Sequence, residues 1–366
     1  MRGRPADDAA LVEALCRGLH PARPDVEALG AVAASPRGLD LALEHLVVGL
    51  VARELGAAGA LASLPEDRRQ RWRLRLMEVQ RQRATLDEAA DAAVAALAEA
   101  GIVPVLLKGA ALGRTVYAEP HLRPMSDVDL LIDAGRLAGA LAALARAGMR
   151  VPPEEDVDFW RRAYYNLPVE WTGRGSVQIE MHWSISQPDR HPVAVAGLLR
   201  RAVSLPAGVG RVLSPVDLLL HQALHHSYHF FQPKLIWVHD LALLHRDPPP
   251  LEPVLERARQ WGMLRPLALS CLQVEKVYPG CLTEAYRRWA ADYRPAVRIE
   301  RRFRSADPVA LLDGWQRRRR QLVLSFLMLD GRAQRLGALA GWVGRVLRFG
   351  DREGHRRLEA FRPREK

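Results

Sequence analysis

The chain has 366 residues, 49% of them hydrophobic, which is enough for two or three domains with buried cores, and no apolar run is long and uncharged enough to span a bilayer. Three scattered cysteines and a charged beginning without a signal-peptide pattern exclude a disulfide framework and predict a cytoplasmic protein. The net charge of +11 comes from arginine, which we attribute to high-GC codon usage more than to nucleic-acid binding, because lysine occurs only at positions 108, 234, 276 and 366.

Residues 1–100 are predicted to form helices. Apolar residues recur at helical spacing in 8–19 and 39–55, and a long helix is expected to begin after Pro65 and to end at Gly101. We find no catalytic chemistry in this region and expect it to pack and to shape one wall of a cleft. Its clustered arginines are expected to face solvent: Arg68, Arg69, Arg71, Arg73 and Arg75.

A short strand and a short helix come next. The apolar sequence VPVLLK at 103–108 is typical of a buried strand, and Gly109 marks the turn that ends it. The following AALGRTVY has the composition of a short helix. Pro120 and Pro124 then break the chain before the sequence DVDLLID, which is predicted to be a second strand.

This second strand carries two acids on one face. Side chains alternate along a strand, so Asp127, Asp129, Leu131 and Asp133 share a side, and Val128, Leu130 and Ile132 take the other. Two carboxylates this close raise each other's pKa unless a cation lies between them, and Mg²⁺, which prefers oxygen ligands, is the usual cation. Asp133 is expected to cap the Ala/Leu helix that follows. In the alternative reading, Asp127 caps a turn and Asp129 is an edge-strand acid.

A third acid is expected on a neighbouring strand. In residues 176–183, Gln178, Glu180 and His182 share the face opposite the apolar residues, so Glu180 is the candidate. Its alternative is a solvent-facing strand acid. A strand within 163–172 is predicted to form a hairpin with this one through Gly173-Arg174-Gly175, both strands being antiparallel neighbours of the DVDLLID strand. Residues 151–160 (VPPEEDVDFW) are predicted to be an acidic connector. The competing acids are Asp133, Asp156, Asp158 and Glu170.

Together, LLKGAAL, Tyr117 and RPMSDVDLLID resemble the nucleotidyltransferase superfamily with a DNA polymerase β-type core, and more narrowly a bacterial uncharacterised nucleotidyltransferase family with an LKG…RPxSDxDLL signature. The resemblance implies a glycine turn beside the NTP phosphates and two Mg²⁺ ions, with Mn²⁺ as a substitute, held by Asp127, Asp129 and Glu180. The last of these matches the family's acid-x-His-Trp strand. Gly109 matches the glycine turn, whereas Ala110 replaces the usual Gly or Ser and loses a hydroxyl contact while keeping its backbone N–H.

Cationic and polar residues near these motifs are assigned to nucleotide binding. Lys108 is expected to neutralise phosphate charge, the alternative being a lysine that only extends from the strand end. Arg123 is expected to clamp phosphate, or else to form a loop salt bridge. Ser126, within the RPMSD part of the signature, is included with them, as are Gly109 and Ala110.

The chain is predicted to be helical again from Leu213, with Ser214 as the helix cap before Pro215. His221, His225 and His229 share one helix face, which makes a zinc site a minor alternative. The resembling family carries an H…H…W..D pattern here, matched by His225, His229, Trp237 and Asp240. We therefore predict that these two histidines line the cleft or are hydrogen-bonded structural residues, and that His182 lines the cleft.

Two more residues of this region are candidate nucleotide contacts. Asp240 is expected to bind the nucleotide or to orient His225, the alternative being a buried acid paired with an Arg or His. Lys234 is expected to reach a phosphate, the alternative being a surface charge.

After a break at 247–250, helices are predicted at 254–262, 267–278, 284–293, 315–330 and 335–350. The arginine run at 317–320 is expected to be a solvated helix face, with a phosphate patch as its alternative. The last helix is expected to pack on the bundle, with a membrane-surface helix as its alternative.

The sequence therefore predicts an α+β fold. A small mixed-sheet nucleotidyltransferase core at 101–206 would lie between an N-terminal helical region at 1–100 and a C-terminal helical bundle at 207–350, followed by a polar tail at 351–366. The predicted function is metal-dependent transfer of NMP from an NTP such as ATP to a hydroxyl or phosphate of a small-molecule or peptide acceptor, in a setting such as natural-product biosynthesis. The rivals are a phosphotransferase on the same metal scaffold and a non-catalytic, Arg-rich helical protein that binds nucleic acid or another partner.

Overall fold

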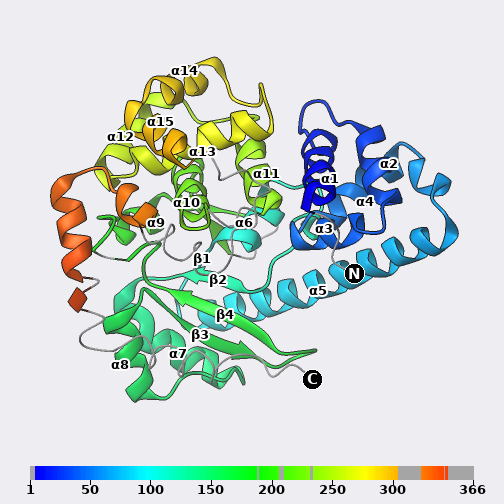
Figure 1. The fold of residues 1–366 in the computed structure, drawn as a ribbon. Coiled ribbons are helices and arrows are strands. Elements are labelled where there is room, and N and C mark those ends of the chain that lie inside the picture. Colours follow the sequence, from blue (N-terminus) through cyan, green and yellow to red (C-terminus); the bar gives the residue numbers. More distant parts are fainter. Residues whose placement is uncertain are drawn as a thin grey trace.

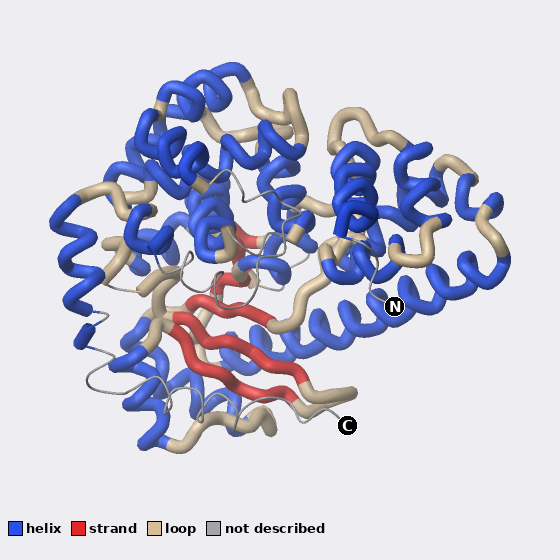
Figure 2. Tube along the Cα trace, viewed as in Figure 1, coloured by secondary structure: helices blue, strands red, loops and turns tan. Residues whose placement is uncertain are grey.

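Helices surround one six-stranded mixed sheet in the computed structural model, which describes residues 5–187, 189–205, 210–230, 234–303, 323–341 and 343–344 (Figures 1 and 2). Helical regions precede and follow the sheet in the chain, and this confirms the predicted α+β class. The arginine run at 317–320, the tail at 351–366 and parts of the helices predicted at 315–330 and 335–350 lie outside the described residues.

The N-terminal region is helical, as predicted. The long predicted helix is present and ends just before Gly101, whose φ of 66° suits glycine. The segment predicted at 39–55 forms two helices instead of one, because the chain turns at Leu46, which has a φ of 60°. The elements are α1 (Pro5–Gly18), α2 (Val26–Ala34), α3 (Gly38–Glu44), α4 (Val48–Ala57), η1 (Ala60–Ser63) and α5 (Glu66–Glu99).

The sheet has the strand order β3-β4-β2-β1-β6-β5. The predicted β3–β4 hairpin is antiparallel, but β4 runs parallel to β2, and β3 is not a neighbour of β2, so this part of the prediction was wrong. The chain crosses from β2 through two helices to the sheet edge, and the hairpin then returns β4 beside β2 in the same direction. The strands are β1 (Val105–Leu106), β2 (Val128–Leu131), β3 (Asn166–Trp171), β4 (Val177–His182), β5 (Val203–Ser204) and β6 (Arg211–Val212).

The predicted acidic connector at 151–160 is largely a helix, α8 (Glu154–Ala163). Its three acids occupy the first turn and two arginines the last, the distribution that the helix dipole favours. Phe159 and Trp160 are buried against the sheet. The acids that indicated a solvated connector are thus the start of an amphipathic helix.

The two faces of the sheet belong to different hydrophobic cores. Val128 and Leu130 of β2 and Ile179 of β4 pack into one core with α5, α7 (Leu137–Arg146) and α8, whereas Leu131 joins the other. This confirms the predicted alternation along β2. The polar residues of β2 and β4 consequently share the face toward α6 (Lys108–Thr115).

The second core joins helices from both ends of the described chain, including α1–α4 and α10–α14. Ser214 caps α10 as predicted, by accepting a hydrogen bond from the Asp217 backbone N–H. The predicted division at residues 100, 206 and 350 stays a prediction. The helices are α9 (Val195–Arg201), α10 (Pro215–Tyr228), α11 (Leu235–Leu244), α12 (Leu251–Trp261), α13 (Leu264–Val277), α14 (Glu284–Asp292) and α15 (Arg294–Arg302).

None of the helices in the described part of the chain combines the length and hydropathy that crossing a membrane requires.

Candidate active site

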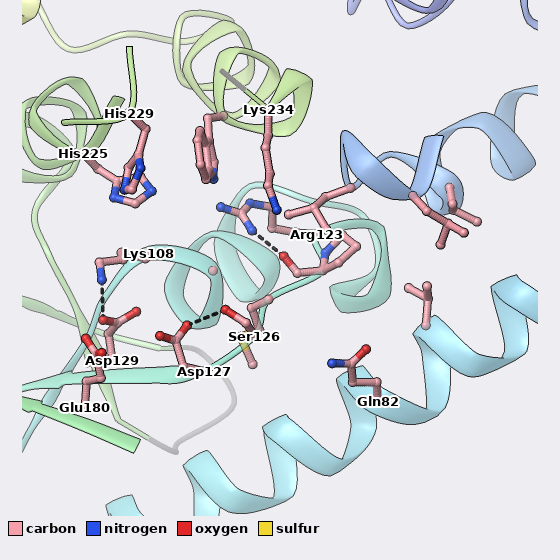
Figure 3. A pocket seen from close by; sticks show the side chains of 18 residues that line it. Gln82, Lys108, Arg123, Ser126, Asp127, Asp129, Glu180, His225, His229 and Lys234 are labelled. Carbon is pink, nitrogen blue, oxygen red and sulfur yellow. Dashed lines mark hydrogen bonds and ion pairs between the residues drawn. The ribbon is translucent and has the colours of Figure 1, made fainter. Parts of the chain in front are cut away.

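A cleft of about 430 Å³ lies above the β2 and β4 strands, between α6, the N-terminal helices and the junction of α10 and α11. Most of the predicted site residues line it (Figure 3). They are Lys108, Gly109, Arg123, Ser126, Asp127, Asp129, Glu180, His225, His229 and Lys234. Ala110, His182 and Asp240 are not part of this lining.

Three carboxylates gather at one end of the cleft. Asp127 immediately precedes β2, Asp129 lies within it, and Glu180 is the register partner of Asp129 on the parallel strand β4. Because paired residues on adjacent strands point to the same face, Asp129 and Glu180 lie side by side. Asp129 is buried, whereas Asp127 and Glu180 are partly exposed to the cleft.

Asp129 is held by two nitrogen donors. Lys108 Nζ lies 2.5 Å and His182 Nε2 lies 2.8 Å from the same oxygen, Asp129 Oδ1. His182 Nε2 is also 3.3 Å from Glu180 Oε2, which accepts a hydrogen bond from Asn166 Nδ2 at 2.7 Å. His182 therefore lies behind the carboxylates and orients them, and it does not face the cleft as predicted.

The two aspartates have opposite electrostatic surroundings. Burial, reinforced by the charges of Asp129 and Glu180, raises the pKa of Asp127 to about 7. Burial also acts to raise the pKa of Asp129, but Lys108 and His182 outweigh it and hold that pKa below its usual value. The His182 pKa is raised, because its hydrogen bonds to Asp129 and Glu180 overcome the effect of burial.

These residues fit a divalent cation. The candidate ligand atoms of Asp129, Glu180 and His182 lie within 4.8 Å of one another, and Asp127 adds a third carboxylate at the cleft. Carboxylate oxygens are the donors that Mg²⁺ and Mn²⁺ prefer. The histidines of α10 form no such three-ligand group within the described residues, so the structure does not support the zinc alternative there.

The glycine turn places the start of α6 at the cleft. The first N–H groups of a helix have no acceptor within it, so they are available to an anion. A Cβ on Gly109 would lie 2.8 Å from Met125 Cβ, so only glycine lets the loop that contains Arg123 pack this closely. Ala110 is 1% exposed, and its methyl group is part of the core beneath the helix.

Asp240 lies behind the cleft instead of in its lining. Both of its carboxylate oxygens are 2.8 Å from Arg123 Nε, and Tyr117 Oη donates to Oδ1 at 2.6 Å. It is 1% exposed, and the pair with Arg123 is the arrangement given above as its alternative reading. The carboxylate therefore positions the guanidinium that lines the cleft.

An aromatic group and a second cation complete the wall formed by the α10–α11 junction. The rings of His225 and His229 are 4.8 Å apart between centroids, and His229 is 4.6 Å from Trp237. Burial, followed by the nearby lysines, lowers the pKa of His229 to about 4, so the imidazole is neutral at pH 7. Lys234 Nζ lies 5.9 Å from the centroid of the Trp237 ring.

The sequence predictions named neither Arg83 nor the individual residues by which the N-terminal helices line the cleft. Arg83 of α5 is 2% exposed and donates to three carbonyl oxygens: Arg123 at 2.7 Å, Pro120 at 3.0 Å and Gly109 at 3.3 Å. Its spacing from Leu86 and Ala90 on one helix face was the available signal. The N-terminal helices shape one wall, as expected, through Leu43, Leu46, Val48, Val79 and Gln82.

Comparison with known proteins addresses the family of this chain. Residues 35–279, well over half of the chain, match a family model described as uncharacterised nucleotidyltransferase. No curated protein and no solved structure matches the chain. The matched segment contains every residue that lines the cleft, and the family supports a general nucleotidyltransferase function. By this match, the chain belongs to the uncharacterised nucleotidyltransferase family.

Proposed function

We propose that this protein transfers NMP from an NTP to a hydroxyl or phosphate of a small-molecule or peptide acceptor, with a divalent metal as cofactor. The observation that carries the proposal is the convergence of Asp127, Asp129 and Glu180 at one end of the cleft, beside the start of α6. Carboxylates that hold metal next to a phosphate-binding helix start are what transfer at an α-phosphate requires.

The triphosphate would lie between α6 and the cationic wall. The free N–H groups of α6 and the Lys108 ammonium face it from one side. Arg123 and Lys234 face it from another side (Figure 3). Burial is the main cause of the lowered pKa of Lys234, and the nearby charge of Arg123 is the second. Within the described residues Lys234 forms no ion pair with a carboxylate, so it is available for a phosphate.

The acids would hold the metal and handle the proton. Asp127, Asp129 and Glu180 would bind Mg²⁺ or Mn²⁺, and the bound ions would activate the acceptor hydroxyl and balance the charge of the leaving pyrophosphate. We assign Glu180 to accept the proton of that hydroxyl. The acceptor oxygen then forms a bond to the α-phosphorus as the bond between that phosphorus and the bridging oxygen to the β-phosphate breaks.

Labelled nucleotides test this function. With Mg²⁺ and a panel of hydroxyl-bearing and phosphate-bearing acceptors, the protein should transfer label from α-labelled NTP and none from γ-labelled NTP. The Asp127→Asn/Asp129→Asn variant should lose about 10³-fold or more of this rate, because both metal-binding carboxylates are removed. Transfer of the γ label would instead indicate a phosphotransferase. Undiminished α-label transfer by the double variant would refute the assigned site.

A further inference from the structure

Lys108 is placed where a cation bound by the acids would lie. Its Nζ is 2.5 Å from Asp129 Oδ1, and Glu180 and Asp127 follow Asp129 in the size of their electrostatic effect on it. Two of the four lysines in this arginine-rich chain, Lys108 and Lys234, line the same cleft. An ammonium on a flexible stem can change partners more readily than the planar, forked guanidinium of arginine.

The backbone fixes the base of this side chain. Lys108 is the first residue of α6 and has a φ of 43°, in the left-handed region that non-glycine residues rarely adopt. The neighbouring Leu107 N–H is tied to the Asp129 carbonyl at 3.0 Å. The backbone is therefore anchored to β2, and the stem beyond Cα is the part of Lys108 that can move.

The ammonium and a divalent ion compete for the same oxygen. Mg²⁺ binds carboxylate oxygens at about 2.0–2.1 Å, and a second cation 2.5 Å from that oxygen would be strongly repelled. His182, which does not line the cleft, already donates to Asp129 Oδ1. An ion that binds Asp129 Oδ1 from the cleft would therefore take the position of the lysine.

We propose that Lys108 is an internal counterion that keeps the acid cluster assembled until a divalent metal displaces it toward the triphosphate. This inference rests on the proposed function and adds an order to it. The same side chain opposes metal binding to the free protein and supports nucleotide binding once the metal is present. Its removal should therefore shift the two affinities in opposite directions.

The test measures Mn²⁺ binding to the metal-free protein without nucleotide. The electron paramagnetic resonance signal of the free ion reports how much Mn²⁺ stays unbound. Lys108→Met should bind Mn²⁺ about tenfold more tightly than the wild type, since a competing charge is gone. Lys234→Met is the matched control, because it removes the same charge from the same cleft but from above Trp237, and its Mn²⁺ affinity should change less than about twofold. In Mg²⁺, both variants should bind a non-hydrolysable ATP analogue more weakly.

Equal or weaker Mn²⁺ binding by Lys108→Met would overturn the inference. Lys108→Gln gives a second, polar replacement, which should show the same direction, and thermal unfolding checks that each variant is folded. If neither the wild type nor any variant binds Mn²⁺, with or without nucleotide, the metal-dependent function fails as well. If all bind equally and Asp129→Asn abolishes binding, the function stands and the role of Lys108 is refuted.

Discussion

The two aspartates of one short motif differ because their partners differ. Asp129 points between Lys108 and His182, and both donors contact the same oxygen. Asp127, two residues earlier, contacts the hydroxyl of Ser126 at 3.1 Å, and no cation within the described residues lies at ion-pair distance from it. The uncompensated negative charge of the cleft is therefore concentrated at Asp127.

Replacement of Asp127 by asparagine should stabilise the metal-free protein at alkaline pH. The pKa of Asp127 is raised to about 7 in the folded protein, so the fold is favoured at low pH, where this carboxyl group is protonated. That stability is lost as the pH rises through the raised pKa. The advantage of Asp127→Asn should thus grow from about pH 4 and reach about 1–2 kcal/mol above pH 7. Thermal unfolding with a chelator present measures it.

Asp133→Asn is the control for this experiment. Asp133 accepts a hydrogen bond from the Gly135 backbone N–H, and asparagine is an equally good cap, so its effect should be small at every pH. A stability difference between Asp127→Asn and the wild type that does not vary with pH would contradict the prediction. Saturating Mg²⁺ should remove the advantage, because the wild-type carboxylate then has its cation.

Strand alternation alone was enough to predict which residues of β2 and β4 share a face. The choice of Glu180 among several acids also used its place as the lone acid of a strand that ends in His-Trp, as in the family that the sequence resembles. Alternation could not show that His182 lies behind the acids or that Asp240 pairs with Arg123. Those positions depend on contacts between segments more than 50 residues apart in the chain, as the separations of 53 and 117 residues in these pairs show.

At the scale of elements, one helix supports the side of the cleft formed by α6 and the loop before β2. Arg83 of α5 contacts carbonyl oxygens of α6 and of the loop before β2, and it pairs with Asp87 at 2.7 Å. Arg83→Met should destabilise the protein by about 3–5 kcal/mol, since it leaves buried carbonyl groups unpaired and leaves Asp87 with Arg114 as its remaining ion-pair partner. Urea unfolding measures this loss.

The exposed neighbour Arg81 provides the comparison for Arg83. Arg81→Met removes the same charge two residues away on the same helix, but from a solvent-facing position, and should stay within about 0.5 kcal/mol of the wild type. Similar losses in both variants would show that the contacts of Arg83 do not support the site. Arg83→Lys should recover part of the stability, because a lysine keeps the charge but cannot reach three carbonyl groups and an acid at once.

Elements with a clear apolar repeat could be predicted, and those that depend on their neighbours could not. The long helix α5 and the helices α12, α13 and α14 match segments that their periodicity predicted. The helix α8 was missed because its acidic first turn has the composition of a connector. The direction of β4 was missed because a hairpin fixes the relation of β3 to β4 but not which of them joins β2.

At the scale of the whole molecule, the helices before and after the sheet are built on one core. Residues of α1–α4 and α10–α14 pack in the same hydrophobic cluster, and the His45 carbonyl accepts a hydrogen bond from the Ile236 backbone N–H at 3.3 Å. Arg246 likewise donates to the Pro21 carbonyl at 2.8 Å. The sequence did not predict this shared core, because periodicity within a helix identifies its apolar face but not the helix that covers it. The cleft is thereby closed by walls from distant parts of the chain.

A shared core predicts that both helical regions unfold together. Leu50 of α4 is 1% exposed and Leu220 of α10 is 0% exposed, so Leu50→Ala and Leu220→Ala should each cost about 2–5 kcal/mol and lower the same calorimetric transition. Leu74→Ala, at a leucine that is 58% exposed on α5, should leave that transition within about 0.5 kcal/mol. Two transitions, of which each core variant shifts only one, would mean that the N-terminal helices are an independent unit. The apolar wall of the cleft would then be free to move relative to the acids. A single transition would instead mean that the walls of the cleft are held together in the ligand-free protein.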